Sequence, residues 1–323
     1  MDLLVDLVTS PYIQFFILAL VAGLFRSDLE IPDQFTKVMA MLLMLTIGLK
    51  GGLSLRDSTT PFSEIALVLG AGIAIGFLIP FIGYALLKKT TQLSQLDAAA
   101  LAAHYGSISV VTFSYAITYL ESHGYDYPGY IITLMAFMEG PAIFSGLLLA
   151  KRGQKGKQKN IFTPHLLKDA LMNSSIVLLL GGMVMGYSAD AAKMDAVSVY
   201  FIKPFPAILC LFLLELGLLT ARQLRDSRDL KAPIILFSLY MPIIAATIGF
   251  SVAYLLRLEI GAAILFATLC GSASYIAVPA AMRLALPKAN IPLCVTCSLA
   301  LTFPFNLFVG VPLYGYIATQ LFN

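Results

Sequence analysis

The chain has 323 residues, of which 59% are hydrophobic and only 12% are charged, with a formal net charge of +3 and a mean hydropathy of +0.86. A soluble globular domain carries about 25% charged residues, so this composition excludes a water-soluble protein folded around one buried core. It indicates an integral membrane protein.

Ten apolar runs are long enough to cross a hydrocarbon core of about 30 Å, which takes about 20 residues of helix. In chain order they cover 10–26, 34–52, 62–87, 95–120, 129–150, 166–187, 199–221, 232–256, 260–283 and 292–319. Strands of a membrane barrel are about half as long and alternate in polarity, so these runs predict helices. We therefore expect an all-α membrane protein with ten transmembrane helices.

Basic residues are divided unevenly among the loops between these spans. When each Lys and Arg is assigned to its nearest loop, 16 fall on odd-numbered loops and 5 on even-numbered ones. Cytoplasmic loops carry the excess of basic residues, which predicts cytoplasmic odd loops and both termini outside. The stretch KRGQKGKQKN, 151–160, has five basic residues and no apolar periodicity. It predicts a solvated cytoplasmic linker over 151–165, between one half at 1–150 and another at 166–323.

The second half repeats the first. DAAALAAHYGSISVVTFSYAI, from Asp97, aligns with AAILFATLCGSASYIAVPAAM, from Ala262. LTIGLKGGLSLRD, ending at Asp57, aligns with LELGLLTARQLRD, ending at Asp226, which sets Gly48 opposite Gly217 and Arg56 opposite Arg225. Each half holds five spans, so the halves must enter the membrane in opposite orientations. Such a 5+5 inverted repeat is typical of secondary transporters.

Small residues and hydroxyls interrupt the fourth and ninth spans at aligned positions. Glycine tolerates a break in a helix, and broken helices expose backbone N–H and C=O groups for a substrate near the bilayer midplane. Serines also serve close helix packing in membranes, but the symmetric placement favours a site formed by two broken, crossing helices. The predicted substrate-binding residues are Gly106, Ser107, Ser109, Thr112, Gly271, Ser272 and Ser274.

Glu139 is an ionisable residue inside the fifth span, where a charge is costly and usually marks an ion or proton pathway. In the aligned stretch LTFPFNLF, Thr302 falls opposite Glu139 and Asn306 lies one helical turn beyond. Carboxylate, hydroxyl and amide oxygens suit a hard cation, so we predict a Na⁺ site at these three residues. The alternative is a protonated Glu139 in packing or proton coupling. Glu215, deep in the seventh span, is a candidate for a domain interface.

At these residues the chain resembles the sodium-dependent bicarbonate transporters of cyanobacteria and their bacterial relatives. The matching stretches are LTIGLKGGLSLRDS, GSISVVT, MEGPA, and PAAMRLALPKANIP leading into LTFPFNLFVGVPLY, in the same order over almost the whole length. The resemblance implies a fold like that of the bile acid sodium symporters, in which a core domain of spans 3–5 and 8–10 moves against a gate domain of spans 1, 2, 6 and 7. It also implies a homotrimer in the lipid of a bacterial inner membrane, Na⁺ as coupling ion, and frequent control by a PII-like protein.

The chain departs from this family in the ninth span. Family members usually have an SSSD-type stretch where this chain has Ser272-Ala273-Ser274-Tyr275, and a further serine at Val111. Two hydroxyls and a carboxylate are therefore missing. Tyr275 joins the predicted substrate-binding residues, because it could fill part of the cavity or bind a larger, less polar solute.

Three function classes follow. The first is Na⁺-coupled uptake of bicarbonate or a similar small anion by alternating access. The second is a Na⁺- or H⁺-coupled carrier of an organic anion on the same fold. The third is an intramembrane hydrolase, in which His104 and Ser107 would form a dyad. No orienting acid accompanies this dyad, so we expect no enzyme. We also expect no nucleic-acid partner.

Overall fold

The computed structural model describes residues 9–151, 174–227 and 230–322, and these form helices and connecting loops without a strand. Within this part of the chain, seven helices are long and apolar enough to cross a membrane: Asp33–Arg56, Phe62–Thr90, Gln95–Ser122, Tyr130–Lys151, Ala192–Asp226, Ala232–Leu255 and Ile291–Leu321. Three shorter apolar helices cover Pro11–Leu24, Ile176–Ser188 and Ile260–Cys270. The protein is thus an all-helical, multi-pass membrane protein, and the ten-span count stays a prediction.

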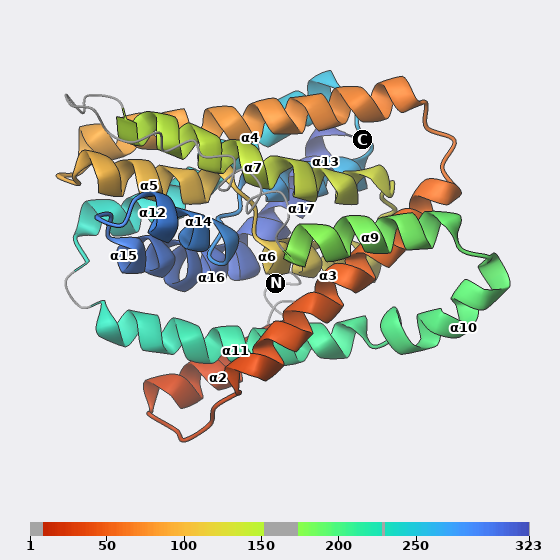
Figure 1. Cartoon of the computed structure of the whole chain (residues 1–323), viewed down its shortest axis with the longest axis horizontal. Helices are drawn as coiled ribbons and strands as arrows, with labels where there is room; N and C mark the ends of the chain where they lie inside the picture. Colours follow the sequence, from red (N-terminus) through yellow and green to blue (C-terminus); the bar gives the residue numbers. More distant parts are fainter. Residues whose placement is uncertain (1–8, 152–173, 228–229, 323) are drawn as a thin grey trace.

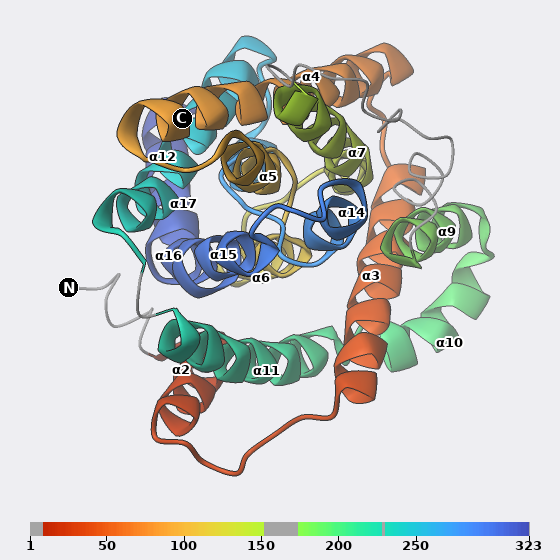
Figure 2. The same cartoon turned by 60° about the vertical axis from the view of Figure 1, so that its left-hand side comes forward.

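Five helices, which we call the outer helices, lie along one side of the molecule (Figures 1 and 2). They are α2 (Pro11–Leu24), α3 (Asp33–Arg56), α9 (Ser174–Ser188), α10 (Ala191–Phe201) and α11 (Phe205–Asp226). Helix α3 packs along α9, and α2 packs along α11. Gly48 of α3 abuts the backbone at Leu179, and Gly217 of α11 abuts the backbone at Phe16. The aligned glycines therefore permit equivalent close helix contacts.

The remaining helices form an inner bundle. From the first half it contains α4 (Phe62–Thr90), α5 (Gln95–Gly106), α6 (Val110–Ser122) and α7 (Tyr130–Lys151). From the second half it contains α12 (Ala232–Leu255), α13 (Ile260–Cys270), α14 (Ala277–Ala285), α15 (Ile291–Val295), α16 (Phe303–Phe305) and α17 (Val311–Leu321). Figure 2 shows α5 in the middle of this bundle, and every residue from Ala98 to Gly106 is buried.

The fourth and ninth predicted spans are both broken. Helix α5 ends at Gly106 and α6 starts at Val110, while α13 ends at Cys270 and α14 starts at Ala277. The tenth span is a continuous helix that widens into π-helical turns at Thr296–Thr302 and Asn306–Gly310, on either side of α16. Like the two broken spans, this segment departs from the regular α-helix. Such π-helical turns often occur at functional sites.

The seventh predicted span differs from the structure. We predicted one helix over 199–221, but the membrane-length run Ala192–Asp226 contains a turn at 202–204, so that α10 ends at Phe201 and α11 runs from Phe205 to Asp226. Pro204 and Pro206 have no backbone N–H to continue the helix, which explains the break before α11. The predicted linker 151–165 lies outside the described residues except for Lys151. The division into core and gate domains stays a prediction.

Candidate functional site

The two helix breaks are joined by hydrogen bonds between the halves of the chain. The backbone N–H of Ser109 donates to Ser272 Oγ at 2.9 Å. The backbone N–H of Ser274 donates to the carbonyl oxygen of His104 at 2.8 Å. Breaking a helix inside a membrane frees backbone groups that need partners, and each break here supplies partners for the other. The aligned Gly-Ser segments therefore meet in space.

The two breaks are not bonded in the same way. Ser272 Oγ accepts from Ser109 and donates to the carbonyl oxygen of Leu269 at 2.9 Å. Its aligned residue, Ser107, is 1% exposed, and its Oγ has no hydrogen-bond partner among the described residues. An unpaired buried hydroxyl costs about 1–3 kcal/mol. Such a group calls for an explanation, and a bound water or solute would provide one.

Ser109 caps the start of α6. Its Oγ accepts from the backbone N–H of Thr112 at 3.2 Å and from the Thr112 hydroxyl at 2.9 Å. The first intrahelical bond of α6 runs from Phe113 N to Ser109 O. The N–H groups of Val110 and Val111 therefore have no acceptor inside the helix. They give the first turn of α6 a partial positive charge that favours an anion.

A cavity of about 50 Å³ lies at the first turns of α6 and α14. Helix α7 contributes Glu139, and the outer helices α3 and α11 close the cavity. The lining residues are Ala40, Leu43, Met44, Ile108, Ser109, Val110, Val111, Glu139, Phe212, Ser274, Tyr275, Ile276 and Ala277. None of these is a lysine, arginine or histidine. Glu139, which is 5% exposed, is the one charged residue of this lining.

The structure brings four predicted site residues onto this cavity: Ser109, Ser274, Tyr275 and Glu139. The Tyr275 ring packs edge-on against Phe303. Its hydroxyl is buried beside Ser109 and makes no hydrogen bond of good geometry with any described residue.

Three other predicted residues stabilise the backbone beside the cavity without lining it. Ser272 and Thr112 hold Ser109 through the bonds described above. Gly106 packs against the Pro80 ring of α4, where a Cβ atom would overlap it. These residues shape the break, and the lining described above does not include them.

Thr302 and Asn306 are held by hydrogen bonds within the inner bundle. Thr302 Oγ1 donates to Ser238 O at 2.7 Å, so the Tyr105 hydroxyl, also at 2.7 Å, donates to Thr302. Asn306 Nδ2 donates to Gly271 O at 2.8 Å, and its Oδ1 accepts from Tyr314 at 3.2 Å. Each side-chain oxygen keeps a second acceptor position for a cation. Hydroxyl and amide oxygens suit Na⁺, but Thr302 and Asn306 do not line the cavity that Glu139 lines, so a cation site shared by the three residues stays a prediction.

His104 and Ser107 do not form a dyad. His104 Nδ1 lies 2.7 Å from the carbonyl oxygen of Ala100 and must donate to it. Neither His104 Nε2 nor Ser107 Oγ has a hydrogen-bond partner in the described part of the chain. A serine nucleophile needs a base within hydrogen-bond reach, so this arrangement does not support the hydrolase hypothesis.

Sequence reasoning missed the apolar wall of the cavity. Leu43 and Met44 come from α3, and Phe212 comes from α11. Leu43 and Phe212 stand five residues before the aligned Gly48 and Gly217, respectively. Their equivalent positions in the repeat could have identified Leu43 and Phe212 as cavity residues, although neither residue is polar.

The family model of the Na⁺-dependent bicarbonate transporter superfamily matches residues 11–319. The chain belongs to this superfamily. Membership confirms the family predicted from sequence and implies a transporter of an anion rather than an enzyme. The sodium dependence of the superfamily is consistent with Na⁺ as the coupling ion. A comparison with curated proteins gives no match. The likeness to bile acid symporters stays a prediction.

Proposed function

We propose that this superfamily member is a Na⁺-coupled symporter that takes up bicarbonate or a similar small anion by alternating access. The observation that carries the proposal is the shared cavity, where the N-terminal turns of α6 and α14 meet Glu139. In this proposal Ser109, Ser274 and Tyr275 contact the anion.

The charges of the lining explain why the anion would need a cation. At an effective dielectric constant of 20, an anion about 4 Å from an ionised Glu139 would be repelled by about 4 kcal/mol. A helix N-terminus offers an anion at most about 2 kcal/mol, so two N-termini roughly cancel this repulsion. Net binding then requires a cation at the carboxylate or its protonation. Each ligand therefore tightens the binding of the other, which is the basis of symport.

Bicarbonate suits this donor and acceptor pattern. Its oxygens can accept from the amides of Val110 and Val111 and from the cavity hydroxyls, and its own O–H can donate to an acceptor such as Glu139. Chloride and nitrate have no such donor. The small volume of the cavity also favours a small solute over a large one.

The remaining predicted residues have supporting roles in this proposal. Gly106 and Gly271 permit the breaks, Ser272 and Thr112 position Ser109, and Ser107 offers an unpaired hydroxyl. Thr302 and Asn306 would complete the Na⁺ site beside Glu139. A homotrimer in the lipid of a bacterial inner membrane, with both termini outside and a PII-like regulator, belongs to the same proposal.

A carrier of an organic anion, coupled to Na⁺ or H⁺, is the second candidate. It is favoured by the apolar wall of Leu43, Met44 and Phe212 and by the Tyr275 ring. An apolar wall adds affinity for a hydrocarbon group and little for bicarbonate. Tyr275 would have to move to admit such a solute.

Uptake by purified protein in proteoliposomes tests the proposal. Radiolabelled bicarbonate is added under an inward NaCl gradient or an equal choline chloride gradient, at the same pH on both sides. We expect uptake under NaCl, its loss with a sodium ionophore, and weak competition by nitrate or chloride. Uptake at the same rate with and without Na⁺ would contradict the proposal. Stimulation by a proton gradient, or displacement by a larger carboxylate, would favour the second candidate.

A further inference from the structure

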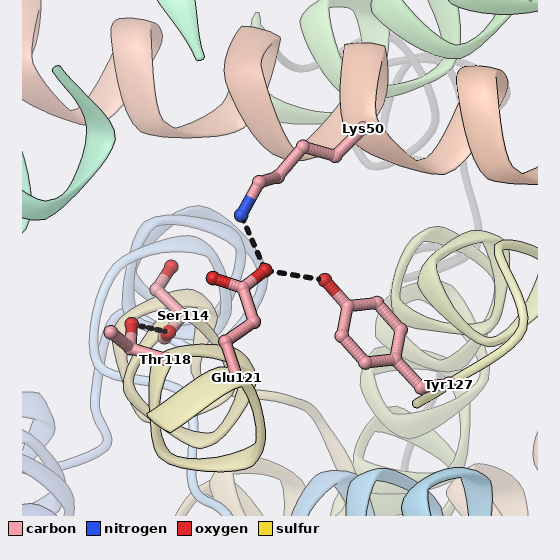
Figure 3. Close-up of polar contacts among 5 residues, drawn as sticks. All are labelled: Lys50, Ser114, Thr118, Glu121 and Tyr127. Atoms are coloured by element: carbon pink, nitrogen blue, oxygen red, sulfur yellow. Dashed lines mark hydrogen bonds and ion pairs between the residues drawn. The ribbon is translucent and has the colours of Figure 1, made fainter. Parts of the chain in front are cut away.

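An ion pair joins the outer helices to the inner bundle at one end of the molecule. Lys50 Nζ of α3 lies 2.6 Å from Glu121 Oε1 of α6 (Figure 3). Helix α3 packs mainly against α9 and α6 mainly against α13, and the two helices also contact each other. The pair therefore bridges two layers of the fold.

Each partner is held by a neighbour from its own layer. The Lys50 ammonium sits 4.9 Å from the ring centre of Phe205, at the start of α11. Glu121 Oε1 accepts from the Tyr127 hydroxyl at 3.0 Å, and Tyr127 lies in the loop between α6 and α7 (Figure 3). Burial, and then the charge of Glu121, raise the pKa of Tyr127, which keeps its hydroxyl a donor. Each charge thus has a second contact within its own layer.

The pair lies on one side of the anion cavity. Lys50 is six residues beyond Met44 on α3, or about 9 Å along the helix axis. Glu121 is ten residues beyond Val111 on α6, or about 15 Å. Met44 and Val111 both line the cavity. Moving from the cavity toward the C-terminal ends of α3 and α6 therefore leads to the ion pair.

A larger cavity lies at the other end of the molecule. It has a volume of about 770 Å³ and lies between the end of α4, the end of α11 and the starts of α12 and α15. Gln223, on its wall, is 18 residues beyond Phe205 on α11, or about 27 Å from the end that Lys50 contacts. Here the layers are joined by neutral bonds, from Thr296 Oγ1 to Gln223 Oε1 at 2.9 Å and between Thr296 and Ser227 at 3.0 Å.

We propose that Lys50, Glu121 and Tyr127 form a latch that holds α3 against α6 at one face of the transporter and is released when that face opens. The inference rests on alternating access in the proposed function. The distribution of basic residues places the latch outside and the large cavity inside. The latch must open in every transport cycle for the anion to reach Ser109 and Ser274 from outside.

The exposure of the pair suits a contact that opens and closes. The Lys50 and Glu121 side chains are 18% and 42% exposed, and ion pairs in contact with solvent contribute little stability. A strong pair would trap the protein in one state. Loss of the latch should therefore change the populations of the two states by about two- to fivefold, without unfolding the protein.

Cysteine labelling tests the latch. The native cysteines Cys210, Cys270, Cys294 and Cys297, all buried and free, are replaced by serine or alanine, and Leu43→Cys on the cavity wall becomes the reporter. A membrane-impermeant thiol reagent is added to one face at a time, using vesicles of both orientations. We expect Lys50→Met or Glu121→Gln to raise the labelling rate from the latch face about two- to fivefold and to lower it from the other face.

Two comparisons make the result specific to this ion pair. The reversed pair Lys50→Glu with Glu121→Lys should return labelling toward the unmodified rate. Asp57→Asn removes the Arg56–Asp57 pair, which lies at the same end of α3 but bridges no layers, and should leave labelling unchanged. Equal labelling in the latch variants and Asp57→Asn, or no recovery with the reversed pair, would overturn the proposal.

A milder variant and the choice of readout keep the test interpretable. Tyr127→Phe keeps both charges and removes only the hydroxyl bond, so it should give a smaller rise if the charge variants fail to fold. Labelling needs no substrate. A wild-type protein that fails to transport bicarbonate would therefore contradict the proposed function, while the latch would stand or fall on labelling alone.

Discussion

Arg56 and Arg225 make equivalent contacts in the two halves of the chain. Arg56 Nη1, at the end of α3, donates to the carbonyl oxygen of Ala189 just beyond α9, at 3.3 Å. Arg225 Nη1, at the end of α11, donates to the carbonyl oxygen of Gly23 in the last turn of α2, at 2.6 Å. The last carbonyls of a helix lack intrahelical donors and carry partial negative charge, so each arginine caps a neighbouring helix. Aligned residues thus perform the same task.

Removing Arg225 should destabilise the protein more than removing Arg56. A hydrogen bond to a charged group contributes about 1.5–3 kcal/mol, and the bond of Arg225 is the shorter one. Arg225→Gln should lower the thermal unfolding midpoint in detergent clearly, and Arg56→Gln less. Arg225→Lys, which keeps the charge, should recover part of the loss. An Arg225→Gln protein as stable as the wild type would contradict the capping role.

Alanine at Gly48 or Gly217 should prevent correct packing of the outer helices. A Cβ at Gly48 would overlap the carbonyl oxygen of Leu179, and one at Gly217 would overlap that of Phe16. Backbone atoms cannot yield as a side chain can, so both variants should express poorly or elute as aggregates in size-exclusion chromatography. Gly181→Ala, where a Cβ meets no atom within 4 Å, is the matched control and should behave as the wild type.

Glu139→Gln should abolish Na⁺ stimulation of uptake in a folded protein. The amide removes the charge that a cation would offset, so anion binding no longer depends on Na⁺. Thermal stabilisation by NaCl relative to choline chloride should disappear as well. Glu215→Gln is the control, because Glu215 is a second buried carboxylate that does not line the cavity. Wild-type Na⁺ stimulation in Glu139→Gln would make a proton-coupled or uncoupled carrier the better interpretation.

Ser109→Ala combined with Ser274→Ala should weaken anion binding at least about tenfold. Each lost hydrogen bond costs about 0.5–3 kcal/mol, and tenfold corresponds to about 1.4 kcal/mol. The KM for bicarbonate should rise, and stability should fall by about 1 kcal/mol because Ser109 caps α6. Ser145→Ala changes a buried serine of α7 that donates to Ala142 O and should leave the KM unchanged. An unchanged KM in the double variant would place the site elsewhere.

Tyr275→Phe should raise the stability of the protein and lower its affinity for the anion. The buried hydroxyl makes no well-formed hydrogen bond among the described residues, so its removal should stabilise the empty protein by up to about 1–3 kcal/mol. Affinity should fall if the hydroxyl binds the anion. Tyr275→Ser enlarges the cavity and should admit larger carboxylates, measured by competition against bicarbonate uptake. Lower stability in Tyr275→Phe without a change in KM would give the hydroxyl a purely structural role.

Composition and local pattern were enough to predict much of the architecture. The membrane class follows from hydropathy, because a spanning helix needs about 20 consecutive, mostly apolar residues, and such a run can be read directly from the sequence. The breaks at Gly106 and Gly271 follow from small and polar residues within apolar runs, and each break lies within a few residues of the predicted position. The equivalence of Arg56 and Arg225 follows from the repeat.

Only the tertiary structure decided which of these residues share a site. It placed Glu139 on the cavity with Ser109 and Ser274, whereas Thr302 and Asn306 form hydrogen bonds with backbone carbonyls of the inner bundle. The physical reason is that a local pattern determines where a helix starts and breaks. It leaves open how the helix is rotated about its axis and which distant helix it crosses. Those depend on packing between segments more than 150 residues apart, as between Ser109 and Ser272.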